Sequence, residues 1–157
     1  MTAATDQEMS GAEPEAMVLT HGTLESSDLP RARDFYENVL GLRCVQHGPI
    51  AQLVAGCVDF GIVNVNKHRD KISPQGYENR WILSVGDEQA VADIHRKAVE
   101  SSFCASVGNI TRDGGIVRFV IQDGDSNWWD VTSLPADHYN RYFDRSAPGS
   151  VPIGPNG

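Results

Sequence analysis

The sequence has no long apolar run and few cysteines, and each absence narrows what the protein can be. No stretch approaches the roughly 20 apolar residues of a membrane-spanning helix. Met1–Ala16 has neither the basic start nor the apolar core of a secretory signal. Cys44, Cys57 and Cys104 are odd in number and lack the spacing of a metal site. We therefore expect a cytoplasmic protein with buried, reduced cysteines, and a reactive thiol is the open alternative.

A basic surface is also missing from the sequence. The chain has 13 Lys and Arg residues against 21 Asp and Glu residues, which gives a formal net charge of −8. Proteins that bind nucleic acids ordinarily carry a stripe of positive charge, and the sequence contains none. A length of 157 residues and a hydrophobic content of 40% fit one globular domain with a real core. The expected partner is a small molecule, and neither nucleic acid nor a membrane is expected.

Both ends of the chain read as tails around one folded region. Residues 1–16 are acidic and rich in small side chains, and residues 146–157 are rich in Pro and Gly. We expect a disordered N-terminal tail at 1–16, a single domain at 17–145 and a flexible C-terminal tail at 146–157. Within the domain we expect two modules, at about 17–67 and 78–134.

Two amphipathic helices have clear start signals. Asp28 suits the N-cap of a helix that runs to about Leu40, with Pro30 in the first turn where its missing N–H costs nothing. Asp87 caps a second helix over about Glu88–Ser101. The apolar side chains expected to form the buried stripe of this second helix are Val91, Ile94, Ala98 and Val99.

The remaining folded sequence is typical of β-strands. Runs rich in β-branched and apolar residues predict eight strands, at 18–26, 43–47, 51–58, 61–66, 80–86, 105–111, 116–122 and 128–133. The order is one strand, one helix and three strands, and then the same again. We therefore predict an α+β fold of two βαβββ modules, whose mixed sheets curl around a cleft.

An internal repeat supports the two modules. The offset that relates the two helix caps, Asp28 and Asp87, also relates Leu24 to Leu83. Near the end of each module, Asp59-x-x-x-x-Asn64-Val65 matches Asp125-x-x-x-x-Asp130-Val131.

Two segments resemble a known family. In the first, His21 on a strand is followed by Asp28-Leu29, by Phe35-Tyr36 on the helix and by Leu40-Gly41-Leu42. The second is Asp123-Gly-Asp125-Ser-Asn127-Trp-Trp-Asp130-Val131, a polar turn that leads into a strand. Over about Val18–Ser133 the sequence is similar to the vicinal oxygen chelate superfamily of glyoxalases, bleomycin-resistance proteins and extradiol dioxygenases. The resemblance implies the fold predicted above and a site between the modules.

The resemblance also implies a divalent metal, held by residues of the first and last strands of each module. The repeat places these positions at His21, Asn64, Arg80 and Asp130. His21 and Asp130 are the expected metal ligands, for Fe, Mn, Ni, Zn or Mg, and a third ligand is not identified. Asn64 is a poor neutral donor, and the guanidinium of Arg80 does not bind a cation. Loss of the metal during evolution therefore stays open.

Strand alternation predicts which other side chains reach the cleft. Arg80 can bind a substrate carboxylate or phosphate, or pair with Asp130; a register slip of one residue would put Trp81 there instead. Trp128 can stack on a flat substrate or belong to the core. The other predicted site residues are Glu25 as a proton-moving base, Asn64 in substrate contact and His47 as a proton carrier at the cleft mouth. His95 is expected to face solvent on the second helix.

Two functions of different classes follow from these residues. The first is a metal-assisted lyase, isomerase or dioxygenase that acts on a substrate with vicinal oxygens, with His21 and Asp130 as ligands. The second is a metal-free binding protein of the bleomycin-resistance type, which holds a cationic or aromatic compound beside Trp128. Arg80 at a ligand position favours the second function. The resemblance implies a homodimer in either case.

Overall fold

The structure is a computed structural model that describes residues 21–55 and 61–138. Both predicted tails and Cys57 lie outside the described residues. The elements follow one another as β1 (His21–Ser26), α1 (Leu29–Asp34), η1 (Phe35–Val39), β2 (Arg43–Gln46), β3 (Ala51–Ala55), β4 (Gly61–Asn66), η2 (Arg69–Lys71), β5 (Trp81–Ser84), α2 (Glu88–Glu100), β6 (Cys104–Val107), β7 (Thr111–Asp113), β8 (Ile116–Asp123) and β9 (Trp128–Thr132).

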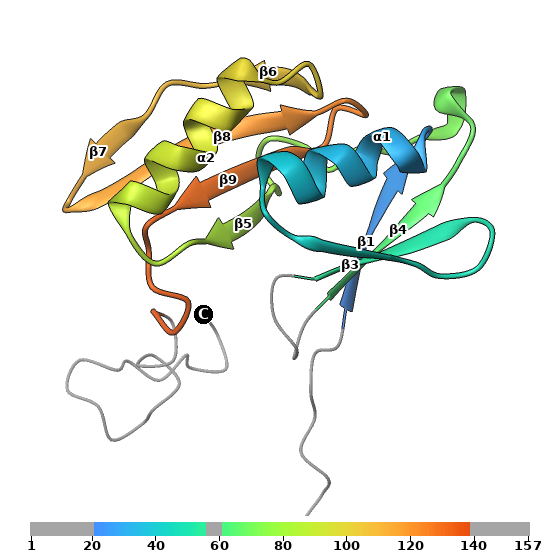
Figure 1. Cartoon of the computed structure of the whole chain (residues 1–157), viewed down its shortest axis with the longest axis horizontal. Helices are drawn as coiled ribbons and strands as arrows, with labels where there is room; N and C mark the ends of the chain where they lie inside the picture. Colours follow the sequence, from blue (N-terminus) through green and yellow to red (C-terminus); the bar gives the residue numbers. More distant parts are fainter. Residues whose placement is uncertain (1–20, 56–60, 139–157) are drawn as a thin grey trace, which may run out of the picture.

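The strands form two mixed sheets, one for each module (Figure 1). The order is β1-β4-β3-β2 in the first sheet and β5-β9-β8-β6 in the second, where β7 also pairs with β8. In each module the first and last strands are parallel neighbours, and the other pairs are antiparallel. The predicted α+β class with two βαβββ modules is confirmed.

The expected caps start both helices. The Asp28 carboxylate accepts a hydrogen bond from the Arg31 backbone N–H at 3.0 Å, and Asp87 accepts one from Ala90 at 2.7 Å. The first helix then widens into the π-helical turns of η1, where the Leu40 N–H donates to the Phe35 carbonyl at 3.2 Å. Gly41 ends it with a φ of +74°, a left-handed conformation that glycine adopts without strain.

The structure corrects three predictions about local structure. The strand predicted at 105–111 is divided into β6 and β7, which both pair with β8 and are separated by residues 108–110. Val99, predicted to be buried on α2, is 62% exposed. His95, predicted to face solvent, packs edge-on against Phe119 at 4.9 Å and hydrogen-bonds the Gly108 carbonyl at 3.0 Å.

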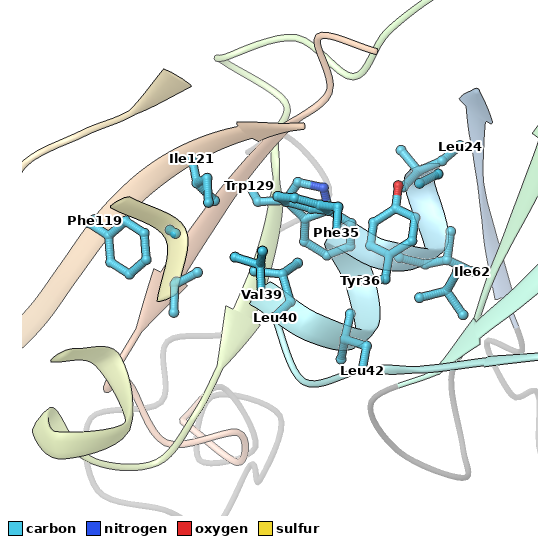
Figure 2. Close-up of a cluster of buried hydrophobic side chains, with 14 of the residues drawn as sticks. Leu24, Phe35, Tyr36, Val39, Leu40, Leu42, Ile62, Phe119, Ile121 and Trp129 are labelled. Carbon is cyan, nitrogen blue, oxygen red and sulfur yellow. The ribbon is translucent and has the colours of Figure 1, made fainter. Parts of the chain in front are cut away.

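One core joins the two modules. Figure 2 shows Phe35 and Tyr36 of η1 between Leu24 and Ile62 of the first sheet and Trp129 of the second. The rings of Tyr36 and Trp129 meet edge-on at 5.7 Å. The first helix therefore packs on both sheets, and the buried apolar surface that stabilises one module also stabilises the other.

The turn between β8 and β9, residues 123–127, forms a polar connection between the modules. The Asp123 carboxylate, which is 2% exposed, accepts hydrogen bonds from the Tyr36 hydroxyl at 3.1 Å and the Asn127 backbone at 2.9 Å. The Asp125 carboxylate accepts hydrogen bonds from the hydroxyls of Ser26 and Ser27, both at 2.6 Å. Burial raises the pKa of Asp123, and the hydrogen bonds oppose that shift. The polar turn of the second resembling segment thus links the two modules.

Strand pairing also corrects the repeat. In the parallel pair of each module, Leu24 lies opposite Asn64 and Leu83 lies opposite Val131. Since Leu24 and Leu83 are equivalent, the equivalent of Asn64 is Val131, and the equivalent of Asp130 is Val63. The sequence match of the two module ends was therefore one residue out of register, and Asn64 belongs to the helix-covered side of its sheet.

Candidate functional site

A buried carboxylate held by two arginines lies on the side of the second sheet that the helices do not cover, here called the open face. Asp130 is directly opposite Ile82, which is 54% exposed, so both side chains project from the open face. Trp81 packs against the helix-side core, as the expected register requires. The Asp130 side chain has 0% exposure because Arg80 and Arg118 cover it.

The two guanidinium groups occupy both oxygens of this carboxylate. Arg80 Nε donates to Asp130 Oδ2 at 3.2 Å, and Arg118 Nε donates to Oδ1 at 3.2 Å. Arg118 Nη2 makes a further short contact with Oδ2. Arg80 is also fixed by its Nη1, which donates to the Tyr77 carbonyl at 2.7 Å. The two guanidinium groups therefore share one buried carboxylate.

Aromatic rings lie beside the arginine cluster. The guanidinium of Arg80 lies over the Tyr77 ring, 4.7 Å from its centroid. Tyr77 meets Trp128 edge-on at 5.3 Å and is itself 47% exposed. Trp128, which is half-buried, is on the open face, whereas Trp129 is in the core. The cluster can therefore offer a charged group and an apolar aromatic surface to one molecule.

The structure places the other predicted site residues apart from this cluster. Asn64 is 0% exposed on the helix side, and neither polar atom of its side chain has a hydrogen-bond partner. His47 is exposed in the β2–β3 turn, at the far edge of the first sheet from β1. The backbone of His21 begins β1, and the side chain of His21 is outside what the structure describes. A Cβ at the next residue, Gly22, would overlap the Trp81 ring, so the Trp81 side chain of β5 reaches the backbone of β1 here.

Glu25 is bonded to a loop and does not project freely. Its Oε2 accepts a hydrogen bond from the Ser73 backbone at 2.7 Å, and its Oε1 is in contact with the Lys67 ammonium. The Lys67 hydrogen bond, together with that from Ser73, lowers the pKa of Glu25. A carboxylate with a lowered pKa is a weaker base, so this environment does not favour the predicted proton transfer.

The described residues do not fit a divalent metal at Asp130. Both of its carboxylate oxygens already accept hydrogen bonds from guanidinium groups, and a cation there would be close to two fixed positive charges. Among residues 21–55 and 61–138, no group of three His, Cys, Asp or Glu side chains is placed to hold an ion. The ion pair of Arg80 with Asp130, one of the alternatives that the sequence left open, is present.

Sequence reasoning missed Arg118. It belongs to β8, opposite Thr132 of the neighbouring strand, and the hairpin register puts it on the same face as Asp130. The sequence contained a signal for this position, because the turn between the two strands fixes the register of the β8–β9 hairpin. Alternation along β8 then places Arg118 on the same face of the sheet as Asp130. The described cysteines offer no nucleophile: burial raises the pKa of Cys44 to about 11 and also raises the pKa of Cys104.

Solved structures share this fold at low sequence identity. The oxidase ChaP-H2 matches with a TM-score of 0.63 and 16% identity, over 77% of this chain and 96% of its own. The fosfomycin resistance protein FosX from Mesorhizobium loti matches with a TM-score of 0.62 and 14% identity, over 80% and 99% of the two chains. A glyoxalase/bleomycin resistance protein from Albidiferax ferrireducens T118 matches with a TM-score of 0.61 and 11% identity, over 74% and 98%.

Comparison with family models and with curated protein sequences found no match. None of the helices in the described part of the chain is long and apolar enough to cross a membrane. The solved structures include glyoxalase, bleomycin-resistance and dioxygenase proteins, the groups that the two sequence segments resemble. The protein has the fold of the vicinal oxygen chelate superfamily.

Proposed function

We propose that this protein binds a small organic anion on the open face, where Arg80 and Arg118 take the role that the resemblance assigns to a metal. The observation that carries the proposal is the sharing of one buried carboxylate by two guanidinium groups. Guanidinium groups on this face favour an anion over the cationic compound expected from the sequence. A carboxylate or phosphate oxygen is the natural acceptor for a guanidinium N–H.

The ligand has an apolar, flat part in this proposal. Tyr77 and Trp128 supply aromatic surface within the same cluster, and Ile82 is exposed on the same face. Asp130 orients Arg80 from one side and the Tyr77 carbonyl orients it from another. A fixed guanidinium loses little conformational freedom when it binds an anion, which favours specific recognition of an aromatic carboxylate.

Binding of benzoate and of its neutral analogue benzamide, measured by isothermal titration calorimetry, tests this function. We expect benzoate to bind, benzamide to bind at least tenfold more weakly, and a chelator to have no effect. Arg80→Gln is expected to weaken benzoate binding at least tenfold. Arg96→Gln on α2 removes the same charge from an exposed site and serves as the control. Equal binding of benzoate and benzamide, or full binding by Arg80→Gln, would contradict the proposal.

Metal-assisted catalysis on a substrate with vicinal oxygens is the second candidate. The contact of the Trp81 side chain with β1 at Gly22 favours it, because it links the strand that begins at His21 to the strand that follows Arg80. His21 and Asp130 remain the proposed ligands, and Asp130 would have to leave its arginine partners. Elemental analysis after incubation with Fe(II), Mn(II), Ni(II), Zn(II) and Mg(II) distinguishes the two functions. About one equivalent per chain that is lost in His21→Ala supports the second candidate; none retained excludes it.

A homodimer is part of the proposal. Val45 and Leu53 are cross-strand neighbours at 55% and 39% exposure, and Ile50 of the adjoining turn is 60% exposed. A row of apolar side chains on an outer hairpin is typical of a protein contact. Sedimentation velocity of the full chain tests this: we expect a dimer, and Val45→Lys should shift it to monomer. A monomer at all concentrations would contradict the dimer without affecting the ligand proposal.

A further inference from the structure

A second hollow lies away from the arginine cluster, where the parallel strands β1 and β4 end. It has a volume of about 570 Å³ and is lined by Ser27, Asp28, Arg31, Asn66, Lys67, His68 and Arg69. This volume falls within the range of about 300–1,000 Å³ that is usual for small-molecule sites. It shares no residue with the Arg80–Asp130–Arg118 cluster, so it is separate from the site proposed above.

Three basic side chains line this hollow. Arg31, Lys67 and Arg69 lie beside the carboxylate of Asp28, and the Asp125 carboxylate is bonded to Ser27 at the edge. The Asp28 carboxylate already accepts the capping hydrogen bond from the Arg31 backbone. Lys67 is paired with Glu25. The structure records no ion pair between the guanidinium groups of Arg31 or Arg69 and any residue in 21–55 or 61–138. Two arginines from different segments are therefore available to one anion, in a chain with a net charge of −8.

The position of Arg31 is built into the fold. Its guanidinium lies on the bare backbone of Gly124, where an added Cβ would be 2.8 Å from Arg31 Cζ. Gly124 belongs to the β8–β9 turn, which Asp125 fastens to Ser27 beside the hollow. Any side chain at residue 124 would push the guanidinium away, so the glycine keeps Arg31 against the second module and next to the hollow.

The segment of the hollow's lining that carries Lys67, His68 and Arg69 is fixed by Glu25. This carboxylate contacts the Lys67 ammonium and accepts the Ser73 N–H at 2.7 Å, so it holds both ends of the segment that carries His68 and Arg69. The Lys67 backbone N–H also donates to the Ser26 carbonyl at 2.8 Å. A fixed wall lowers the conformational cost of binding. Glu25, predicted as a base, is thus a positioning residue for this wall.

We propose that this hollow binds a small molecule through a phosphate group, which Arg31 and Arg69 contact from two different segments of the chain. A phosphate presents several oxygens in a tetrahedral arrangement, so it can accept hydrogen bonds from two guanidinium groups that approach from different directions. The volume leaves room beside the phosphate for an organic part. The inference is independent of the anion proposed for the open face, because the residues of the two sites differ.

Calorimetric titration of the full chain with inorganic pyrophosphate at low ionic strength tests the site. We expect binding that is at least tenfold weaker in the double variant Arg31→Gln/Arg69→Gln. Arg96→Gln is expected to bind like the wild type, because it removes a charge from an exposed position outside the hollow. Absence of binding, or an equal loss in Arg96→Gln, would overturn the proposal.

A variant that retains every charge tests the geometry. Gly124→Ala is expected to weaken pyrophosphate binding at least threefold, because the new methyl group displaces the Arg31 guanidinium. Circular dichroism spectra and melting curves would verify that the variant is folded. Unchanged affinity in folded Gly124→Ala would mean that pyrophosphate senses only overall charge, and the built site would be rejected.

Discussion

The two modules have the same order of elements but distribute polar side chains in opposite ways. In the first, the last strand buries Asn64 against the helix and leaves Val63 on the open face. In the second, the equivalent positions bury Val131 against the helix and place Asp130 on the open face. The second pattern gives every side chain a suitable environment, because Val131 is in the apolar core and Asp130 has two arginine partners. The first pattern buries an amide without a partner.

This difference shows which module carries the polar cluster and which one supports it. A buried polar group without hydrogen bonds costs stability, whereas a fully bonded carboxylate orients its partners. The second module therefore carries the polar cluster that can act on a ligand. The first module supplies Ser26 and Ser27, which receive the β8–β9 turn, and the helix whose aromatic residues fill the shared core.

Removal of the carboxylate of the second module is expected to have the largest effect. Asp130→Ala leaves Arg80 and Arg118 close together without their shared anion, so we expect a loss of about 1.5–3 kcal/mol in the free energy of unfolding. Urea denaturation of the purified variant measures this. A loss below about 1 kcal/mol would mean that the ion pairs contribute little and that the contrast with Asn64 has no energetic basis.

The contact between the modules gives the next largest effect. A methyl group at residue 22 would overlap the Trp81 ring, so Gly22→Ala should displace this ring from β1 and cost about 1–3 kcal/mol. Ser84→Ala, on the open face of the same strand as Trp81, serves as a control with little expected effect. A Gly22→Ala variant as stable as the wild type in thermal melts would contradict this packing.

Conversion of the first module to the pattern of the second should stabilise the protein. Asn64→Val puts the residue type of Val131 at the equivalent position and removes two buried polar atoms without partners. We expect a gain of about 1–2 kcal/mol in the free energy of unfolding, measured by urea denaturation. Val131→Asn is the reciprocal control and should destabilise the protein. A loss of stability in Asn64→Val would show that the amide has a role that its missing hydrogen bonds do not reveal.

The smallest expected effect concerns pH. Glu25 has a lowered pKa in the folded protein, so its contribution to stability is present above its ordinary value of 4.5 and is lost as pH falls through the folded value. The wild type should therefore lose more stability than Glu25→Gln when pH falls from neutral to about 4. Melting temperatures across this range test the expectation, and parallel curves for the two proteins would contradict it.

The sequence was sufficient to predict most of the fold, for local physical reasons. Asp28 and Asp87 are capping residues followed by amphipathic helices, and these signals act over a few residues. The alternation of Trp128 and Trp129 also predicts their faces correctly, because a strand with one buried face has a strict period of two residues.

Long-range packing explains what the sequence did not reveal. In β4 the polar Asn64 lies between Val63 and Val65. This alternation suggests that the two valines are buried and that Asn64 is exposed, which is the opposite of what the structure shows for Asn64. Only the pairing with β1 shows that Asn64 is inside. The helix α2 likewise turns so that His95 packs against Phe119 of β8, which no local signal predicts. Arg118 could be found only after the register of the β8–β9 hairpin was known.

The connection between the modules has a consequence for assembly. Asp125 of the second module hydrogen-bonds Ser26 and Ser27 of the first module. Along the chain, the segment at residues 67–80 joins the two modules. If that segment were too short for the two modules of one chain to pair, the modules of two chains could form the same hydrogen bonds with each other. Shortening the segment should therefore produce a domain-swapped dimer rather than an unfolded chain. The length of this segment, and not the interface, then decides whether a single copy completes the fold.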